Sequence, residues 1–531
     1  MTADSQCGNS ERRLAAVICA AVLLIAPSRP ASATDAEPLP SYNVDLRETT
    51  VSGVSSGAYM AVQFGVAHSA IVKGVGATAG GPYLCAFDRV PSLRGALATA
   101  IARCMQGDPD FPKQAITRTQ LNRMVRTMDA WARSARIDAT SHLKRQRIWL
   151  FHGYNDGLVK SPVSDALYDY YTRYVDPSQI FYKDNLNAAH AQITVDCGEG
   201  ETACNLCPRT GGNFLNLCHD SAAGNAAYDA AGSMLQLFHG ALKARDSSSV
   251  PAGTIVRFSQ REFALDAGGA AASRRISMAE EGFAYVPDSC ARGEPCRVHV
   301  AFHGCGQSAE QIGSAFYRHA GYNRWADENR IIVLYPQTQP TQPTPLAPLL
   351  PLNPQGCWDW WGYNDGLGAR GRFATQAGLQ IAAVKRMLDR LARQHAGAAP
   401  SVSASGEFGA PVNLVVGDFT HRHVALRWDA VGGAIGYHVY RSTVAGGPYG
   451  GAQRRNARLV ESPMFVDTAA QSRTQYFYVV RAVSQSNRES ADSAEVGVLT
   501  ATTPPPCDPF FSLRKGTPVT RTNTPTEAVC P

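Results

Sequence analysis

The chain has 531 residues, of which 44% are hydrophobic and 18% charged, and its formal net charge is +6. This composition is typical of a globular protein with a large core, and a chain of this length should hold about two to four domains. The charge is mild for the size and no dense basic run occurs, so the sequence disfavours nucleic acid as a partner.

The first 33 residues have the three parts of a secretory signal. Arg12 and Arg13 give a basic start, residues 14–26 are apolar, and Ala31-Ser32-Ala33 is a small-residue cleavage site. The apolar run of about 13 residues is short for a bilayer. We therefore expect residues 1–33 to be cleaved near Ala33, giving an extracellular or periplasmic protein without a membrane span. An uncleaved anchor is the alternative.

The cysteine content fits an exported protein. Of 14 cysteines, Cys7 and Cys19 lie in the signal, so an even number remains, as in a disulfide-bonded chain. A bridge can join Cys85 to Cys104, and another can close a small loop between Cys290 and Cys296. The pairing of a further group stays open: Cys197, Cys204, Cys207 and Cys218. A zinc site there is disfavoured by the export signal and by the lack of a second close cysteine pair, so we expect no metal.

A Gly-x-Ser-x-Gly motif follows the first expected strand. Gly53, Ser55 and Gly57 stand between an extended run, 42–51, and a small-residue helical pattern, 58–68. A nucleophile elbow of an α/β-hydrolase requires this strand–turn–helix context. Glycines permit the sharp turn with a strained serine at its apex. A plain Gly/Ser-rich turn is the alternative.

An acidic residue and a histidine follow the next expected strands. Asp156 comes just after the apolar strand 147–151, and His190 comes after the strand 179–183. An α/β-hydrolase carries its acid and base in such loops, in the chain order nucleophile, acid, base. His152 lies on the same strand end as Asp156, and we expect it to be structural.

A possible oxyanion loop occurs late in the chain. The strand 297–302 runs into His303-Gly304-Cys305-Gly306-Gln307, a His-Gly pattern found in oxyanion loops. In an ordinary α/β-hydrolase this loop precedes the nucleophile. A circular permutation explains the reversed order, because the sheet then starts with the strand before Ser55 and the usual early strands come last. Apolar periodicity also predicts a strand at 331–335 and helices at 93–105, 120–137, 226–242 and 375–392.

The sequence changes character near residue 396. Residues 396–408 are rich in Ala, Gly, Ser and Pro and are typical of a linker, whereas 409–503 alternate with the period of β-strands. The second stretch resembles a fibronectin type III domain, with Trp428 in its core and Tyr476 as its tyrosine corner. We expect this domain to serve as a spacer.

The tail, residues 504–531, is bounded by Cys507 and Cys530 and is too small for a core without a bridge.

Residues 34–395 form the expected catalytic domain, and residues 40–395 resemble secreted poly(3-hydroxybutyrate) depolymerases with a permuted hydrolase domain. The resemblance rests on five stretches in order: Gly53-Val54-Ser55-Ser56-Gly57-Ala58-Tyr59-Met60, His152-Gly153-x-x-Asp156, Asp229-Ala230-Ala231-Gly232-Ser233-Met234-Leu235, His303-Gly304-Cys305-Gly306-Gln307 and Cys357-Trp358-x-Trp360. Bacterial members continue with a fibronectin-like domain and a polymer-binding domain. Here only the short tail follows, which puts binding to crystalline polymer in doubt.

The resemblance implies roles for particular residues. Ser55, Asp156 and His190 correspond to the catalytic triad of that family. The backbone N–H groups of Ser56 and Cys305 correspond to its oxyanion hole. Cys305 and Cys357 correspond to a pair of cysteines that form a disulfide beside the active site. The fold class it implies is α/β: a circularly permuted α/β-hydrolase followed by an all-β fibronectin type III-like sandwich.

The expected function is that of a secreted serine esterase acting on a polyester granule or film, without cofactor or metal. Trp358, Trp360 and Trp361 are candidates for an apolar substrate-binding subsite, with core packing as the alternative. Two other functions stay open: an esterase for feruloyl or acetyl groups on plant polysaccharide, and a non-catalytic polymer- or matrix-binding protein.

Overall fold

A computed structural model describes residues 36–87, 93–107, 116–246, 251–345, 347–365, 371–394, 409–460, 463–484 and 488–502. The expected signal, the linker at 396–408 and the tail with Cys507 and Cys530 lie outside these residues. Contacts divide the chain into Met1–Glu37 and Pro38–Pro531, and the helices and strands of the described residues lie in the second unit.

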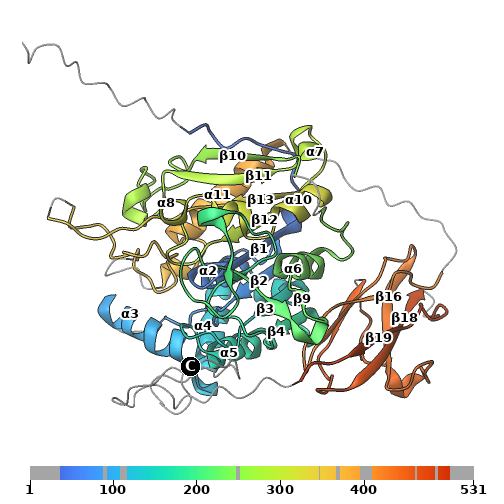
Figure 1. The fold of residues 1–531 in the computed structure, drawn as a ribbon. Helices are drawn as coiled ribbons and strands as arrows, with labels where there is room; N and C mark the ends of the chain where they lie inside the picture. Colours follow the sequence, from blue (N-terminus) through green and yellow to red (C-terminus); the bar gives the residue numbers. More distant parts are fainter. Residues whose placement is uncertain are drawn as a thin grey trace, which may run out of the picture. The chain divides into compact units, whose positions relative to one another are not determined.

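A single eight-stranded sheet organises the first part of this unit (Figure 1). In spatial order its strands are β10 (Thr254–Ser259), β11 (Glu281–Val286), β13 (Ile331–Tyr335), β12 (Arg297–Phe302), β1 (Thr49–Val54), β2 (Val72–Thr78), β3 (Arg147–Phe151) and β4 (Ile180–Lys183). The strands from β13 to β4 are parallel, whereas β10 and β11 are antiparallel. The first strand of the chain thus lies inside the sheet, with late strands on one side and early strands on the other. This topology confirms the permuted α/β-hydrolase.

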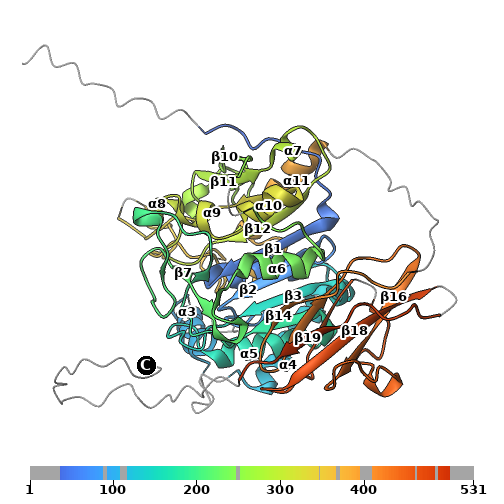
Figure 2. The same ribbon diagram turned by 45° about the vertical axis from the view of Figure 1, so that its right-hand side comes forward.

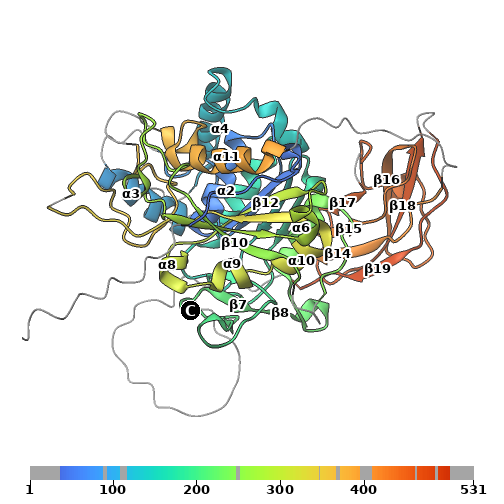
Figure 3. The same cartoon turned by 90° about the horizontal axis from the view of Figure 1, so that it is seen from above.

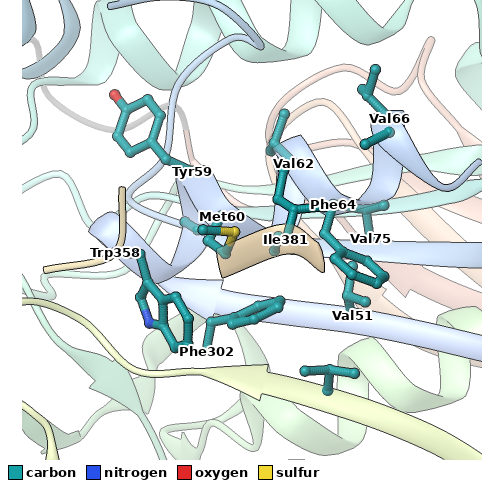
Figure 4. Close-up of a cluster of buried hydrophobic side chains, with 14 of the residues drawn as sticks. Val51, Tyr59, Met60, Val62, Phe64, Val66, Val75, Phe302, Trp358 and Ile381 are labelled. Atoms are coloured by element: carbon teal, nitrogen blue, oxygen red, sulfur yellow. The ribbon is translucent and has the colours of Figure 1, made fainter. Parts of the chain in front are cut away.

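Helices cover both faces of the sheet (Figure 3). On one face lie α2 (Ser56–Ala67), α4 (Arg118–Arg133), α5 (Ser161–Tyr171) and α11 (Leu379–Leu391), and on the other α6 (Ala230–His239), α9 (Ala315–His319) and α10 (Asn323–Asn329). Every residue of α2 and β1 is buried, as expected for a parallel sheet covered on both sides. Figure 4 shows Met60 and Phe64 of α2 above Phe302 and Trp358.

The expected strands at 147–151, 297–302 and 331–335 have the bounds of β3, β12 and β13. The first strand is shorter than expected. Asp45 caps a 3₁₀ turn, Leu46–Glu48, by accepting the N–H of Arg47, so the strand begins only at Thr49. The helix expected at 226–242 starts at Ala230, because the Asp229 side chain accepts the N–H of Gly232 as an N-cap.

Disulfides join Cys85 to Cys104, Cys290 to Cys296 and Cys305 to Cys357. The group whose pairing the sequence left open forms Cys197–Cys204 and Cys207–Cys218, so its sulfurs bridge each other. Both bridges lie in an excursion after β4 that contains the short strands β5 (Gln192–Ile193), β6 (Asn205–Leu206), β7 (Leu215–Leu217), β8 (His219–Asp220) and β9 (Ala226–Ala227).

The C-terminal domain is a sandwich of two antiparallel sheets, as the fibronectin-like pattern predicts. One sheet holds β14 (Val415–Phe419), β15 (Val424–Arg427) and β17 (Met464–Asp467), and the other, seen in Figure 2, holds β16 (Ala434–Ser442), β18 (Gln475–Ser484) and β19 (Val496–Leu499). Trp428 is buried in its core, and the hydroxyl of Tyr476 accepts the N–H of Gln471, a contact typical of the tyrosine corner.

The sandwich is not a detached spacer in this structure. Ala425, Met464 and Val466 belong to the same buried apolar cluster as Phe181 of β4 and Leu237 of α6. The sheet edge at β4 and the face of α6 therefore have a partner within the chain.

Candidate active site

Ser55 stands at the sharp turn between β1 and α2. Its backbone has φ 57° and ψ −123°, a strained conformation for a residue with a side chain. The flanking glycines make the turn sterically possible. A Cβ on Gly57 would lie 2.3 Å from the carbonyl oxygen of Phe302, and one on Gly53 would lie 2.3 Å from the backbone of Gly57. The local geometry is that of a nucleophile elbow.

Asp156 and His190 form a buried pair. Asp156 Oδ2 lies 2.8 Å from Nδ1 of His190, and Asp156 Oδ1 accepts the N–H groups of Leu158 and Val159 at 2.8 and 3.0 Å. Burial alone would raise the pKa of Asp156. The charge of His190 and its hydrogen bond, with help from His152 and the Val159 amide, hold that pKa below its ordinary value. The Asp156 carboxylate is therefore an ionised hydrogen-bond acceptor that orients the imidazole of His190 through its Nδ1 edge.

The sheet brings the four predicted loops to one edge. Ser55 follows β1, Asp156 follows β3, His190 follows β4 and Cys305 follows β12. Because these strands are parallel and paired in register, their carboxyl ends lie side by side, where ligands bind in open α/β sheets. Asp156 also acts electrostatically on Tyr59 in the first turn of α2, where burial and then that carboxylate raise the tyrosine pKa.

The loop after β12 lies directly against Ser55. A Cβ on Gly304 would lie 3.4 Å from Cβ of Ser55. The amides on both sides of Cys305 are engaged: Gly304 N–H donates to Gln307 Oε1 at 2.7 Å, and Gly306 N–H donates to the carbonyl of Gln355 at 2.8 Å. Ser56 is the first residue of α2, where N–H groups have no acceptor within the helix.

Two residues that the sequence analysis did not single out hold this loop. Besides binding Gly304, Gln307 donates from Nε2 to the carbonyls of Asn213 and Phe214, both at 3.1 Å. The buried ring of His303 accepts the N–H of Thr338 at Nε2 and contacts the Gly304 carbonyl through Nδ1. Burial lowers the pKa of His303 to about 4, which keeps it neutral. Their place in the His-Gly-Cys-Gly-Gln motif is the signal that could have identified both.

His152 contacts the carbonyl of Val159 through Nε2 at 2.8 Å, which anchors the turn around Asp156.

The three tryptophans after Cys357 are all buried. Trp358 is 0% exposed and packs against Phe302, with ring centroids 5.0 Å apart. Trp360 stacks on Tyr59 at 4.1 Å, and Trp361 packs edge-on against Trp360. Among the described residues, the indole N–H of Trp360 has no hydrogen-bond partner.

The strained serine, the carboxylate–histidine pair and the adjoining glycine-rich loop define the class of protein: the chain is a serine ester hydrolase of the α/β-hydrolase fold. No protein-family model matches it. A poly(3-hydroxybutyrate) depolymerase of Delftia acidovorans is 35% identical over 459 residues, which are 86% of this chain and 80% of that protein. A polyhydroxybutyrate depolymerase of Talaromyces funiculosus is 34% identical over 65% of this chain and 90% of that protein.

Solved structures agree with these relatives. A PHB depolymerase from Penicillium funiculosum is 31% identical and has a TM-score of 0.54, covering 67% of this chain and 98% of the solved one. A PHB depolymerase complexed with an R3HB trimer matches with the same coverage and TM-score at 30% identity. The chain belongs to the poly(3-hydroxybutyrate) depolymerase family.

In the part of the chain that the structure describes, no helix has the length and apolarity needed to cross a bilayer. Disulfides are typical of exported proteins, and those found here indicate secretion.

Proposed function

We propose that the protein is a secreted serine esterase that hydrolyses poly(3-hydroxybutyrate), or a related polyhydroxyalkanoate, to oligomers and monomers. The observation that carries the proposal is the strained Ser55 at the same sheet edge as the buried Asp156–His190 pair. The substrates named for the relatives supply the polymer class.

In the proposed mechanism, Oγ of Ser55 attacks the ester carbonyl while Nε2 of His190 takes its proton. The Asp156 carboxylate accepts the Nδ1 hydrogen bond, fixes the working tautomer and stabilises the imidazolium. The imidazolium then protonates the leaving hydroxyl end of the polymer. Water, activated by the same histidine, hydrolyses the acyl-enzyme and restores Ser55.

The oxyanion would bind to the backbone N–H groups of Ser56 and Cys305. Such a donor is worth about 3 kcal/mol in the transition state. Cys305 is positioned by its bridge to Cys357 and by the engaged amides beside it, so its amide would need little reorganisation during the reaction.

A substrate subsite is proposed around Trp360. Its ring stacks on Tyr59, four residues from Ser55. Its indole N–H is buried and has no partner among the described residues, so it would be available to donate to an ester carbonyl of a bound polymer. Trp361 would support this ring edge-on, whereas Trp358 packs against Phe302.

We also propose the division of the chain drawn from its sequence: a signal at 1–33 cleaved near Ala33, a catalytic domain at 34–395, a linker at 396–408, a fibronectin-like domain at 409–503 and a tail at 504–531.

The proposal is tested by comparing Ser55→Ala with Ser56→Ala in the mature protein. Ser55→Ala should abolish both clearing of polymer granules and hydrolysis of a soluble 4-nitrophenyl ester. Ser56→Ala should keep much of both, because the proposed role of Ser56 uses its backbone. Among the described residues, its hydroxyl accepts one 3.4 Å contact, from the backbone N–H of Trp358. Substantial activity in Ser55→Ala contradicts the triad.

Product analysis separates the alternatives. Release of hydroxybutyrate and its oligomers supports the proposal, whereas release of ferulate or acetate from polysaccharide without attack on granules assigns another esterase function. A wild-type protein whose Ser55 is not labelled by a fluorophosphonate probe would indicate a binding protein.

A further inference from the structure

A buried lysine joins the catalytic domain to the fibronectin-like domain. Lys183, the last residue of β4, is 0% exposed. Its ammonium donates to the carboxylate of Asp220, to Asp418 Oδ1 at 3.2 Å and to the carbonyl of Phe419 at 3.0 Å. All three donors of the ammonium are used, and two of the acceptors belong to β14 of the fibronectin-like domain.

Asp418 also has hydrogen-bond partners in the catalytic domain. Its Oδ2 accepts the hydroxyl of Tyr228 and Oγ of Ser233, the latter at 2.9 Å, and the residue is 8% exposed. Removing one partner of a buried ion pair leaves an uncompensated charge, which is strongly unfavourable. The two surfaces are therefore chemically complementary, and separating them would break a satisfied polar network.

A second contact holds Asp184, the residue that follows β4. Arg422, in the β14–β15 turn, lies 2.6 Å from Asp184 Oδ2 and stacks over the ring of Tyr182 at 5.1 Å. The neighbouring His423 is buried edge-on against Tyr168. The turn thus binds β4 at its end, where the strand leads into the loop that carries His190.

The end of β4 is also where the loops of the proposed acid and base meet. The carbonyl of Lys183 accepts the N–H of His152 at 2.9 Å, and the carbonyl of Leu186 accepts the N–H of Tyr154 at 3.1 Å. The backbone leading to His190 is therefore paired with the backbone leading to Asp156.

We infer that residues 418–423, which are the end of β14 and the turn that follows it, form a docked support that positions the end of β4 and, through it, the proposed acid–base pair. The fibronectin-like domain is then part of the catalytic framework rather than a tether. Asp418 and Arg422 are its positioning residues. The effect on catalysis rests on the proposed function, whereas the docking itself does not.

The test uses a charge swap in the full-length mature protein: Arg422→Asp, Asp184→Arg and the two combined. Arg481→Asp is the matched control, because Arg481 pairs with Glu489 and Asp492 inside the fibronectin-like domain. Hydrogen exchange of the amides of residues 180–190 reports docking. The kcat and KM for a soluble 4-nitrophenyl ester report positioning.

Each single swap variant should speed exchange at 180–190 and lower kcat about tenfold, with KM nearly unchanged, because small misplacement of acid–base groups slows the chemical step. The combined variant should recover most of both effects, and Arg481→Asp should alter neither. Asp418→Asn should behave like the single swaps. The Arg422–Asp184 pair, in which the Arg422 side chain is 42% exposed, keeps the test valid if Asp418→Asn fails to fold.

Unchanged exchange in the single variants would overturn the docking. Faster exchange with an unchanged kcat would overturn the positioning role. A wild-type protein that lacks esterase activity yet shows the exchange pattern would refute the proposed function while supporting the docking.

Discussion

The orientation of the His190 ring is set by a single oxygen, Oδ2 of Asp156. The other oxygen of Asp156 is held by two backbone N–H groups, so the carboxylate cannot rotate without losing hydrogen bonds. This arrangement fixes the tautomer with its hydrogen on Nδ1 and leaves Nε2 for the proposed proton transfer from Ser55.

Asp156→Asn should lower turnover by about 10⁴ while the protein stays folded, because an amide favours the wrong imidazole tautomer. Steady-state kinetics on a soluble ester, with circular dichroism as a check on folding, measures this. Asp389→Asn is a suitable control, since Asp389 is a half-exposed partner of Lys385 on α11 and lies outside the proposed triad.

The competing base is tested by His152→Ala. Loss of the Val159 contact should reduce stability, but the folded fraction should keep most of its turnover. If His152→Ala is inactive while folded and His190→Ala is active, the base has been assigned to the wrong histidine.

The turn from β1 into α2 depends on close backbone contact. The Cβ of an alanine at Gly57 would meet the carbonyl oxygens of Phe302 and His303 at 2.3 and 2.4 Å. These acceptors belong to β12 and the adjoining loop, so they cannot move aside without disturbing the loop that lies against Ser55.

Gly57→Ala should therefore destabilise the protein by about 1–3 kcal/mol or more through overpacking, and it should lower turnover further by shifting the oxyanion loop. Thermal unfolding and esterase rates measure the two effects. Gly157→Ala is the matched control, because a Cβ there meets nothing within 4 Å and the backbone does not adopt positive φ. Equal behaviour of the two variants would contradict the steric argument.

The Cys305–Cys357 bridge ties the proposed oxyanion loop to the tryptophan segment across a sequence separation of 52. Replacing both cysteines with alanine should cost about 4 kcal/mol in the chain-entropy model and should also reduce turnover. Removing Cys290–Cys296, with a separation of only 6, should cost less and leave turnover intact. Peptide mapping without reduction verifies the pairs. Free thiols at Cys305 and Cys357 would refute the bridge.

Neutral histidines are buried in both domains. Burial lowers the pKa of His299 to about 3, of His303 to about 4, and of His423 in the fibronectin-like domain to about 3. The ordinary value is about 6.5. Because the unfolded chain binds protons more readily, these groups contribute full stability above about pH 6.5 and lose it as the pH falls toward their folded values. Asp359, whose pKa burial raises to about 6, opposes this trend.

Comparing the stability of the wild-type protein with that of His299→Gln measures the contribution of this one histidine to the pH dependence. His299 contacts the hydroxyls of Thr50 and Ser52 at 2.8 Å, so the variant should be less stable at pH 7.5. The difference in melting temperature should narrow as the pH falls to 4, because glutamine takes up no proton. A constant difference across that range would contradict the assignment of a neutral buried ring.

Much of the catalytic framework is encoded locally. Apolar runs specify β3, β12 and β13 to the residue, and the Gly-x-Ser-x-Gly motif specifies its elbow, because both depend on neighbours in sequence. The chain order of Ser55, Asp156 and His190 was enough to assign them to one sheet edge. The late His-Gly loop was enough to predict the permutation, and the parallel pairing of β12 with β1 places that loop beside Ser55.

Other features depend on partners far apart in the chain. The pairing of Cys207 with Cys218 follows from the folded excursion after β4, where several pairings have suitable spacing. The ammonium of Lys183 donates a hydrogen bond to Asp418, which lies 235 residues later in the chain. Nothing in the sequence around either residue indicates that contact. The sequence by itself determined β3, β12 and β13, the elbow and the chain order of the proposed site residues. Tertiary structure alone decided the partners of the four cysteines between residues 197 and 218, the burial of the tryptophans and the docking of the second domain. Disulfide pairing, burial and ion pairing depend on surfaces that exist only after the chain has folded.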